Sequence, residues 1–499
     1  MNQIVRELME QQNIRANLSS LRKVVREMEP EEARGKLEIL WPGYGGQLIG
    51  FLKQEDAKTR KNAALLLGDL QEQQALSALV EAYRGEETRF VRSSYPEACM
   101  SLQAEDYLPV FREQLAQLLA SEPREEEKKH VMEEIRALRK LLIPYDGIAR
   151  HTFHGSGAEV TVLLITNRLH RELIRRNVPV GRASLHPLGI LVETNELDKL
   201  LEYRLFRELV FPVNLKKGKL LPAEPKAAAE AIWASNLMQL LEKLHRGEGV
   251  FYYRVDCRGS MTLEQRSEFI KRFAAQLENS SKGRLVNSPS DYEVEIRLIA
   301  NRDGKFYPCI KLYTIGDRRF AYRKNSIAAS IHPATAALMM KLAEPFLKNS
   351  AQVMDPFCGV GTMLIERAKY SDVHDVYGTD IFGEAIEKAR ENTKLAKMDI
   401  HYVHRDFFDF THDYLFDELI ANMPVRGKKT KEEMAQFYDA FFRKAVQLLK
   451  KDGIMMLYTN EIGHVKKQLR LHREYTLLQE TMMQEKGEYY LIIIGVKGN

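Results

Sequence analysis

The segment best suited to chemistry runs from residue 355 to residue 362 and reads D-P-F-C-G-V-G-T. The apolar residues before Asp355 are typical of a strand, the glycines at 359 and 361 let the backbone turn close to a ligand, and Thr362 opens an apolar helix. The spacing differs from the G-x-G-x-x-G dinucleotide motif, and no Gly-Lys-Ser/Thr of a phosphate loop is present. The acid in this turn suits a ligand with a cationic amino-acid tail, so NAD and ATP are poorly supported.

A second acid, Asp380, lies 25 positions after Asp355, at the end of the next expected strand. An acid in this place can accept hydrogen bonds from both hydroxyls of a ribose. Its position in register with the glycine turn makes Asp380 a candidate binding residue of the same site.

The motif D-P-x-C-G-x-G-T resembles the cofactor motif of class I S-adenosylmethionine-dependent methyltransferases, particularly those acting on nucleic-acid bases. In that family the acid and the glycine turn face the methionine end of the cofactor. The resemblance implies that Asp406 lies near the adenine amino group and Phe407 against the ring, although Asp409 competes with Asp406. The implied cofactor contacts are Asp355, Phe357, Gly359, Gly361, Thr362, Asp380, Ile381, Asp406, Phe407 and Asn422.

Residues 422–425, N-M-P-V, resemble the N/D-P-P-Y/F motif of enzymes that methylate exocyclic amines of adenine or guanine. Such an amine is a poor nucleophile because its lone pair is delocalised into the ring. The side-chain carbonyl of Asn422 and the backbone carbonyl of Met423 can hold both N–H bonds and orient the lone pair, and Pro424 shapes the turn. These three residues are the expected catalytic residues.

Two positions depart from that motif. Met423 stands in place of a proline, and Val425 stands in place of an aromatic residue. Valine cannot stack broadly on a flipped base. Either another aromatic residue therefore supplies the surface, with Phe407, Phe408 and Phe437 as examples, or catalysis is weak or lost.

Residues 317–323 and 328–337 resemble the R-x-Y-R and H-P-x-x-A-A stretch that joins a THUMP domain to the methyltransferase domain of RNA-modifying enzymes. His332 would then lie near the cofactor entrance, or it could simply occupy the turn before Pro333. Basic side chains of the junction and of the catalytic turn can neutralise phosphates of RNA. The predicted substrate-binding residues are Arg323, His332, Arg426, Lys428 and Lys429.

The elements that position these residues follow from the hydrophobic periodicity. Beyond residue 350, strands and helices alternate, which predicts a parallel sheet with helices on both faces and a final antiparallel hairpin. The expected strands are 352–354, 376–379, 400–403, 415–422, 453–460, 476–482 and 489–496, with helical runs between the first five.

The first 145 residues are helical in period. Arg60, Leu70 and Leu79 are matched about 32 positions later by Arg92, Leu102 and Phe111, which resembles HEAT repeats, and an irregular helical bundle is the alternative. Strands at 160–165 and 189–192 predict a small α+β unit, and residues 216–225 read as a linker. Strands at 249–256, 291–299 and 306–313 and a helix at 263–277 predict a second α+β unit.

We therefore expect a multidomain chain of all-α and α/β parts. Its predicted domains are a HEAT-like helical region (1–145), a ferredoxin-like module (150–215), a THUMP-like RNA-binding domain (216–320) and a Rossmann-like methyltransferase domain (325–499). The length of 499 residues fits several domains, and a net charge of +5 requires any nucleic-acid contact to rest on local clusters.

The four cysteines form no C-x-x-C pair, so neither a disulfide scaffold nor a structural zinc site is expected. No metal ligands are predicted. No run approaches the roughly 18 apolar residues of a membrane span, and we expect a cytoplasmic protein.

Together the motifs predict an S-adenosylmethionine-dependent RNA methyltransferase. The first expected target is the exocyclic amine of guanosine in tRNA, and rRNA is the next candidate. The alternatives are an adenine N-methyltransferase on RNA or DNA, and a cofactor-binding RNA adaptor with weak catalysis. The N-terminal helices would suit a protein partner.

Overall fold

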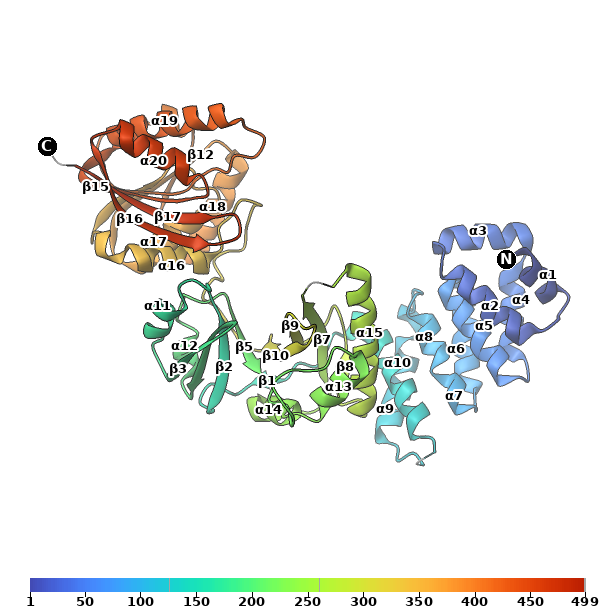
Figure 1. Cartoon of the computed structure of the whole chain (residues 1–499). Coiled ribbons are helices and arrows are strands. Elements are labelled where there is room, and N and C mark those ends of the chain that lie inside the picture. The colour runs from blue at the N-terminus through green and yellow to red at the C-terminus, as the bar shows by residue number, and fades with distance from the viewer. Residues whose placement is uncertain (125, 260, 498–499) are drawn as a thin grey trace. The chain divides into compact units, whose positions relative to one another are not determined.

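The computed structural model describes residues 1–124, 126–259 and 261–497. Contacts divide the chain into two compact units (Figure 1). The first unit combines Met1–Thr152 with Val213–Thr314, and the second combines Phe153–Pro212 with Ile315–Asn499. Across the described residues, no helix has both the length and the apolar character needed to span a membrane.

The N-terminal part of the first unit consists of helices that share one hydrophobic core. They are α1 (Asn2–Met9), α2 (Ile14–Val25), α3 (Pro30–Leu40), α4 (Tyr44–Gly50), α5 (Ala57–Asp69), α6 (Leu76–Gly85), α7 (Arg89–Arg92), α8 (Ser94–Cys99), α9 (Leu108–Ala120) and α10 (Lys128–Asp146). Helix α5 packs against α2 and α8, so each helix layer covers its neighbour's apolar face. The leucines and the phenylalanine of the 32-residue repeat are all buried.

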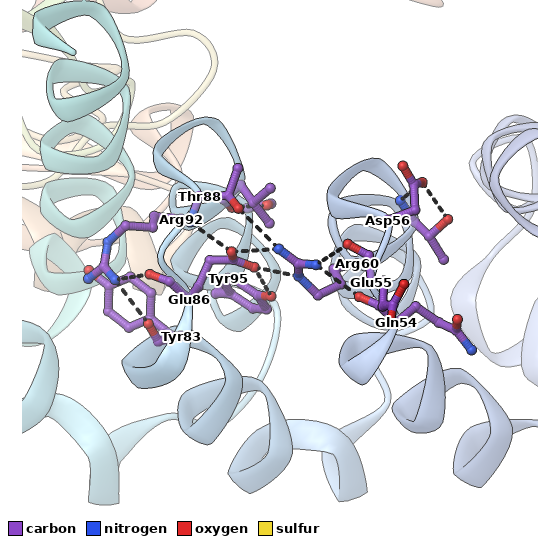
Figure 2. A network of polar contacts seen from close by, with 12 residues as sticks. Gln54, Glu55, Asp56, Arg60, Tyr83, Glu86, Thr88, Arg92 and Tyr95 are labelled. Carbon is purple, nitrogen blue, oxygen red and sulfur yellow. Dashed lines mark hydrogen bonds and ion pairs between the residues drawn. The ribbon is translucent and has the colours of Figure 1, made fainter.

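The two arginines of the repeat have matching roles (Figure 2). Arg60 donates to both carboxylate oxygens of Glu86 at 2.8 Å, and Arg92 donates to Glu134 at 2.8 Å. Both arginines also donate to backbone carbonyls, Arg60 to Gln54 and Arg92 to Glu86. Because a buried ion pair that loses one partner leaves an uncompensated charge, these contacts specify how successive helix layers align.

The remainder of the first unit is an α+β structure. Its strands are β6 (His245–Arg246), β7 (Phe251–Arg258), β8 (Leu285–Asn287), β9 (Val294–Ala300) and β10 (Phe306–Leu312), and its helices are α13 (Pro225–Trp233), α14 (Leu237–Leu244) and α15 (Leu263–Ser280). The order β10-β9-β7-β8 combines an antiparallel β9–β10 pair with parallel pairing of β7 to β8 and β9. The predicted strands and helix of this region are confirmed, with shifted ends.

The second unit begins with residues 153–212, which we call the small module. It contains β2 (Val160–Ile165), α11 (Arg171–Arg176), β3 (Arg182–His186), β4 (Gly189–Thr194), α12 (Leu197–Leu200) and β5 (Glu208–Pro212), and the two-residue β1 (Thr152–Phe153) precedes it. The strands pair antiparallel in the order β3-β4-β2-β5. The sequence predicted β2 and β4 but not β3 and β5, because β3 is largely exposed and carries no apolar run.

Residues 315–497 form a seven-stranded sheet of order β13-β12-β11-β14-β15-β17-β16. The strands are β11 (Ala351–Asp355), β12 (Val373–Asp380), β13 (His401–His404), β14 (Phe416–Asn422), β15 (Leu449–Thr459), β16 (Tyr475–Gln484) and β17 (Tyr489–Val496). Strands β11 to β15 pair in parallel, and β17 is antiparallel to both neighbours. All seven predicted strands are confirmed, as is the antiparallel hairpin.

Helices α16 (Pro333–Ala343) and α17 (Thr362–Tyr370) cover one face of this sheet, and α19 (Lys431–Leu448) and α20 (Ile462–Leu471) cover the other (Figure 1). Helix α18 (Gly383–Ala396) connects β12 to β13. The prediction of a helical run between every pair of the first five strands was wrong at one place. Only a 3-10 turn, η5 (Phe407–Asp409), separates β13 from β14. This connection carries the chain from the sheet edge at β13 back to the centre at β14.

Candidate active site

The glycine turn lies where β11 ends and α17 begins, beside the central strand pair β11 and β14. Gly359 and Gly361 have φ values of +52° and +80°, which side chains with a Cβ rarely adopt. A Cβ on Gly361 would lie 2.2 Å from the hydroxyl oxygen of Tyr402. That hydroxyl is already held by a hydrogen bond of 2.8 Å with the Thr393 hydroxyl. The first turn of α17 is therefore set by the lack of a side chain at this position.

Asp355 is buried at the end of β11, with 1% of its surface exposed. Burial raises the pKa of this carboxyl to about 8, and the charge of Asp380 adds to the rise. The Phe357 N–H donates to Asp355 Oδ1 at 3.0 Å, and this hydrogen bond lowers the pKa and so offsets part of the rise. At neutral pH this acid is held mostly in its neutral form, ready to ionise when a cation arrives.

Asp380 ends β12 and organises the turn from the neighbouring strand. Its Oδ2 accepts the Gly359 N–H and its Oδ1 accepts the Phe382 N–H, each at 2.9 Å. A carboxylate offers about four acceptor sites, so Asp380 can bind further donors while it holds the turn.

These groups open into one cavity of about 610 Å³, formed within the second unit. The cavity is lined by most of the predicted site residues, namely His332, Asp355, Phe357, Gly359, Thr362, Asp380, Asn422, Met423 and Pro424. The structure thus brings the glycine turn, the second acid and the N-M-P-V turn to one place, although they are up to 70 positions apart in the chain.

Eight other predicted site residues do not line this cavity, namely Arg323, Gly361, Ile381, Asp406, Phe407, Arg426, Lys428 and Lys429. Phe407 is buried, with its ring centroid 5.8 Å from that of Phe357, so it supports a lining ring from behind. Exposed Asp406 caps η5 by accepting the Phe408 N–H at 3.0 Å. Beyond Asp380, it is Phe382 rather than Ile381 that lines the wall.

The three basic residues after Pro424 belong to an exposed segment between β14 and α19. Lys429 Nζ lies 5.0 Å from the centre of the Phe437 ring, and Arg426 Nε donates to the Lys429 carbonyl at 3.0 Å. These three side chains therefore place positive charge on the surface next to the N-M-P-V turn rather than inside the cavity.

Asn422 ends β14 with a fixed orientation. Its side-chain Nδ2 donates to the Ala329 carbonyl at 3.1 Å, which assigns the amide NH2 to that contact and keeps Oδ1 as an acceptor. The Met423 N–H donates to the Tyr458 carbonyl at 3.0 Å, so the turn continues the register of β14 against β15. The Ala329 segment also lines the cavity.

His332 both caps a helix and lines the cavity, so the two interpretations of its role are compatible. Its Nδ1 accepts the Ala334 N–H at 3.1 Å at the start of α16. Burial lowers the pKa of His332 to about 4, and the positive charges of Arg207 and Arg323 contribute. His332 is thus neutral at physiological pH and too weak a base to hold a proton.

The aromatic surface comes from residues that the sequence did not single out. None of the three phenylalanines that the sequence offered, Phe407, Phe408 and Phe437, lines the cavity. Tyr458 and Tyr489 line it instead, with ring centroids 5.0 Å apart and planes at 21°. Tyr458 lies opposite Asn422 in the β14–β15 register. Pairing the ends of the two predicted strands in the sequence could have identified Tyr458 as a neighbour of Asn422.

Arg207 is a further lining residue that the sequence did not identify. It belongs to the small module, and no local motif distinguishes it from other exposed arginines. Among residues 1–124, 126–259 and 261–497, no cluster of three or more His, Cys, Asp or Glu side chains could hold a metal ion.

Residues 327–492 match the family model of the methyltransferase small domain. A curated relative, the uncharacterized protein MG259 of Mycoplasma genitalium, is 34% identical over 90 residues, which are 18% of this chain and 20% of the relative. The aligned stretch thus spans a fifth of that relative's length.

Two solved structures resemble a larger share of the chain. TrmN from Thermus thermophilus is 22% identical, covers 68% of this chain and 99% of its own, and has a TM-score of 0.48. A predicted N6-adenine-specific DNA methylase from Listeria monocytogenes is 13% identical, covers 67% of this chain and 95% of its own, and has a TM-score of 0.47. The family match identifies residues 327–492 as a methyltransferase domain, and the predicted S-adenosylmethionine-dependent methyltransferase is confirmed for this part of the chain.

Proposed function

We propose that the protein methylates the exocyclic amine of a nucleobase in RNA, with guanosine N2 in tRNA as the first candidate and rRNA as the next substrate. The observation that carries the proposal is the orientation of Asn422. Its NH2 is held by the Ala329 carbonyl, so Oδ1 remains as an acceptor in the same cavity as the glycine turn.

The residues of the cavity fit S-adenosylmethionine. Thr362 is 3% exposed, lines the cavity, and its buried Oγ1 has no hydrogen-bond partner in the chain, so a bound polar group would satisfy it. Asp355 would hold the cationic amino group, and Asp380 would accept the ribose hydroxyls. When bound, this cofactor supplies a methyl group on a positively charged sulfur.

The chain's own residues orient the target amine. Asn422 Oδ1 and the Met423 carbonyl would accept its two N–H bonds and direct the lone pair away from the ring plane. No strong base is required because the amine proton can leave after transfer. The low pKa of His332 agrees with this, since a neutral imidazole of that kind is a poor proton acceptor.

Tyr458 and Tyr489 would supply the flat surface that Val425 cannot. Base stacking on an aromatic side chain contributes about 1–3 kcal/mol per base. Val425 is 51% exposed at the cavity edge and offers only a small apolar contact.

RNA binding outside the cavity would use exposed charge and the upstream regions. Arg426, Lys428 and Lys429 flank the catalytic turn and can neutralise phosphates. We further propose that residues 216–320 act as a THUMP-like RNA-binding domain and that the HEAT-like helices of residues 1–145 bind a protein partner. An adenine N-methyltransferase, on RNA or DNA, is the alternative activity.

A second candidate function is a cofactor-binding RNA adaptor with weak catalysis. The observation that favours it is Val425, which stands where related enzymes place an aromatic residue.

The test is transfer of labelled methyl from S-adenosylmethionine to total RNA from cells that lack the gene, followed by nucleoside analysis. We expect N2-methylguanosine. Asn422→Ala should lower the single-turnover rate by about 10²–10³-fold, the effect of removing one positioned polar group, while exposed Asn349→Ala should leave it unchanged. N6-methyladenosine as the product would select the alternative enzyme, and no transfer with intact cofactor binding would select the adaptor.

A further inference from the structure

One basic side chain reaches the cavity from outside the matched methyltransferase region. Arg207 precedes β5 of the small module and lines the cavity together with His332, Asn422 and Tyr489. Its Nη2 donates to Thr335 Oγ1 of α16 at 3.2 Å. No carboxylate of the described residues forms an ion pair with it. Its remaining guanidinium N–H groups are therefore available to an anion in the cavity.

The segment that carries Arg207 is held firmly against residues 315–497 of the same unit. Arg204 makes a two-pronged contact with the Glu366 carboxylate, with Nε 2.9 Å from Oε2. The buried Arg319 donates from Nη1 to the carbonyls of Tyr203 and Phe206, at 3.1 and 2.8 Å. Arg204 lies within this segment and Arg319 contacts it from the junction, so both arginines hold the segment in place.

The positive charge of Arg207 acts on two other side chains that line the cavity, His332 and Tyr458. It contributes to the lowered pKa of His332, and it opposes the burial that raises the pKa of Tyr458 to about 12. The pKa of Asp355 responds instead to burial, Phe357 and Asp380. Arg207 lines the same cavity as Tyr458 and Tyr489, and its charge acts on the Tyr458 hydroxyl.

We propose that Arg207 binds a backbone phosphate of the nucleotide whose base enters the cavity, so that the small module completes the active site. The proposal rests on the proposed function. A planar guanidinium with several free N–H groups matches a phosphate well. The site would then distinguish a nucleotide within a strand from a free base or nucleoside, because only the former carries the anion.

The experiment measures kcat/KM for methyl transfer to total tRNA from cells lacking the gene, across a series of salt concentrations. Arg207→Gln should lower kcat/KM by about ten- to hundredfold, the range for a hydrogen bond to a charged group. It should also reduce the slope of log(kcat/KM) against log[salt] by about 0.7–0.9, the effect of one phosphate contact. Arg207→Lys should keep the slope and recover part of the rate.

Arg182→Gln is the matched control. Arg182 is an exposed arginine of the same module, on β3 at the opposite edge of the β3-β4-β2-β5 order. The Arg182→Gln substitution removes the same charge, and it should leave kcat/KM and the slope of log(kcat/KM) against log[salt] at wild-type values. A normal melting temperature and a normal calorimetric Kd for S-adenosylmethionine would show that the Arg207→Gln protein is folded.

Three results would overturn the inference. The first is an unchanged rate and salt slope for Arg207→Gln while the wild type is active. The second is a weaker Kd for S-adenosylmethionine alone, which would assign Arg207 to the cofactor carboxylate. The third is a wild-type protein that methylates no RNA, which would refute the proposed function and this inference with it.

Discussion

Binding of S-adenosylmethionine is expected to release a proton from Asp355. In the free protein burial raises the pKa of this acid to about 8, so about nine tenths of it is protonated at pH 7. A cation placed against the carboxyl favours its charged form and lowers its pKa. Because the bound state then holds fewer protons than the free state, affinity must rise with pH.

The size of the pH effect on Kd follows from the raised pKa of Asp355. Below pH 8 the ionised fraction of Asp355 falls about tenfold for each pH unit, so Kd should rise by about tenfold from pH 7 to pH 6. Calorimetry at pH 7 in two buffers of different ionisation enthalpy should report about 0.9 protons released per cofactor bound.

Asp355→Asn is the control, since the amide can still accept the Phe357 N–H but cannot ionise. This variant should bind the cofactor weakly, with an affinity and an enthalpy that no longer depend on pH or buffer in this range. A wild-type Kd that changes less than twofold between pH 6 and pH 8, with no buffer-dependent enthalpy, would refute the reasoning.

Two further predictions concern the turn and the tyrosine pair. Gly361→Ala should destabilise the protein by more than about 1–2 kcal/mol, the cost of a left-handed non-glycine residue, because its Cβ also overlaps the Tyr402 hydroxyl. Gly463→Ala, which adds a Cβ into open space in α20, should instead raise stability by about 0.5–1 kcal/mol. Urea unfolding measures both, and equal stability of Gly361→Ala and wild type would contradict the account of the turn. Tyr489→Leu should lower kcat/KM for RNA by about 5- to 150-fold through lost stacking, whereas Tyr489→Phe should stay near wild type. If kcat/KM of the leucine variant also stays near the wild-type value, the target base does not stack on these rings.

The local pattern of the chain was sufficient to predict the seven strands, the glycine turn and the N-M-P-V turn. Strand periodicity is a property of neighbouring residues, and glycines followed by an apolar helix can be recognised within about ten positions. The acids Asp355 and Asp380 could be placed together for a related reason, because parallel strands bring their carboxyl ends to one edge of the sheet.

The tertiary structure alone decided which side chains meet in the cavity. The Ala329 carbonyl orients Asn422 from 93 positions away, Tyr458 and Tyr489 become a stacked pair only when β15 and β17 are in register, and Arg207 arrives from another module. The sequence could not show which aromatic rings line the cavity because burial depends on packing from elements distant in sequence, and Phe407 packs behind Phe357. Local sequence therefore determined the strands and the glycine turn, whereas the long-range packing of strands and modules determined which side chains line the cavity.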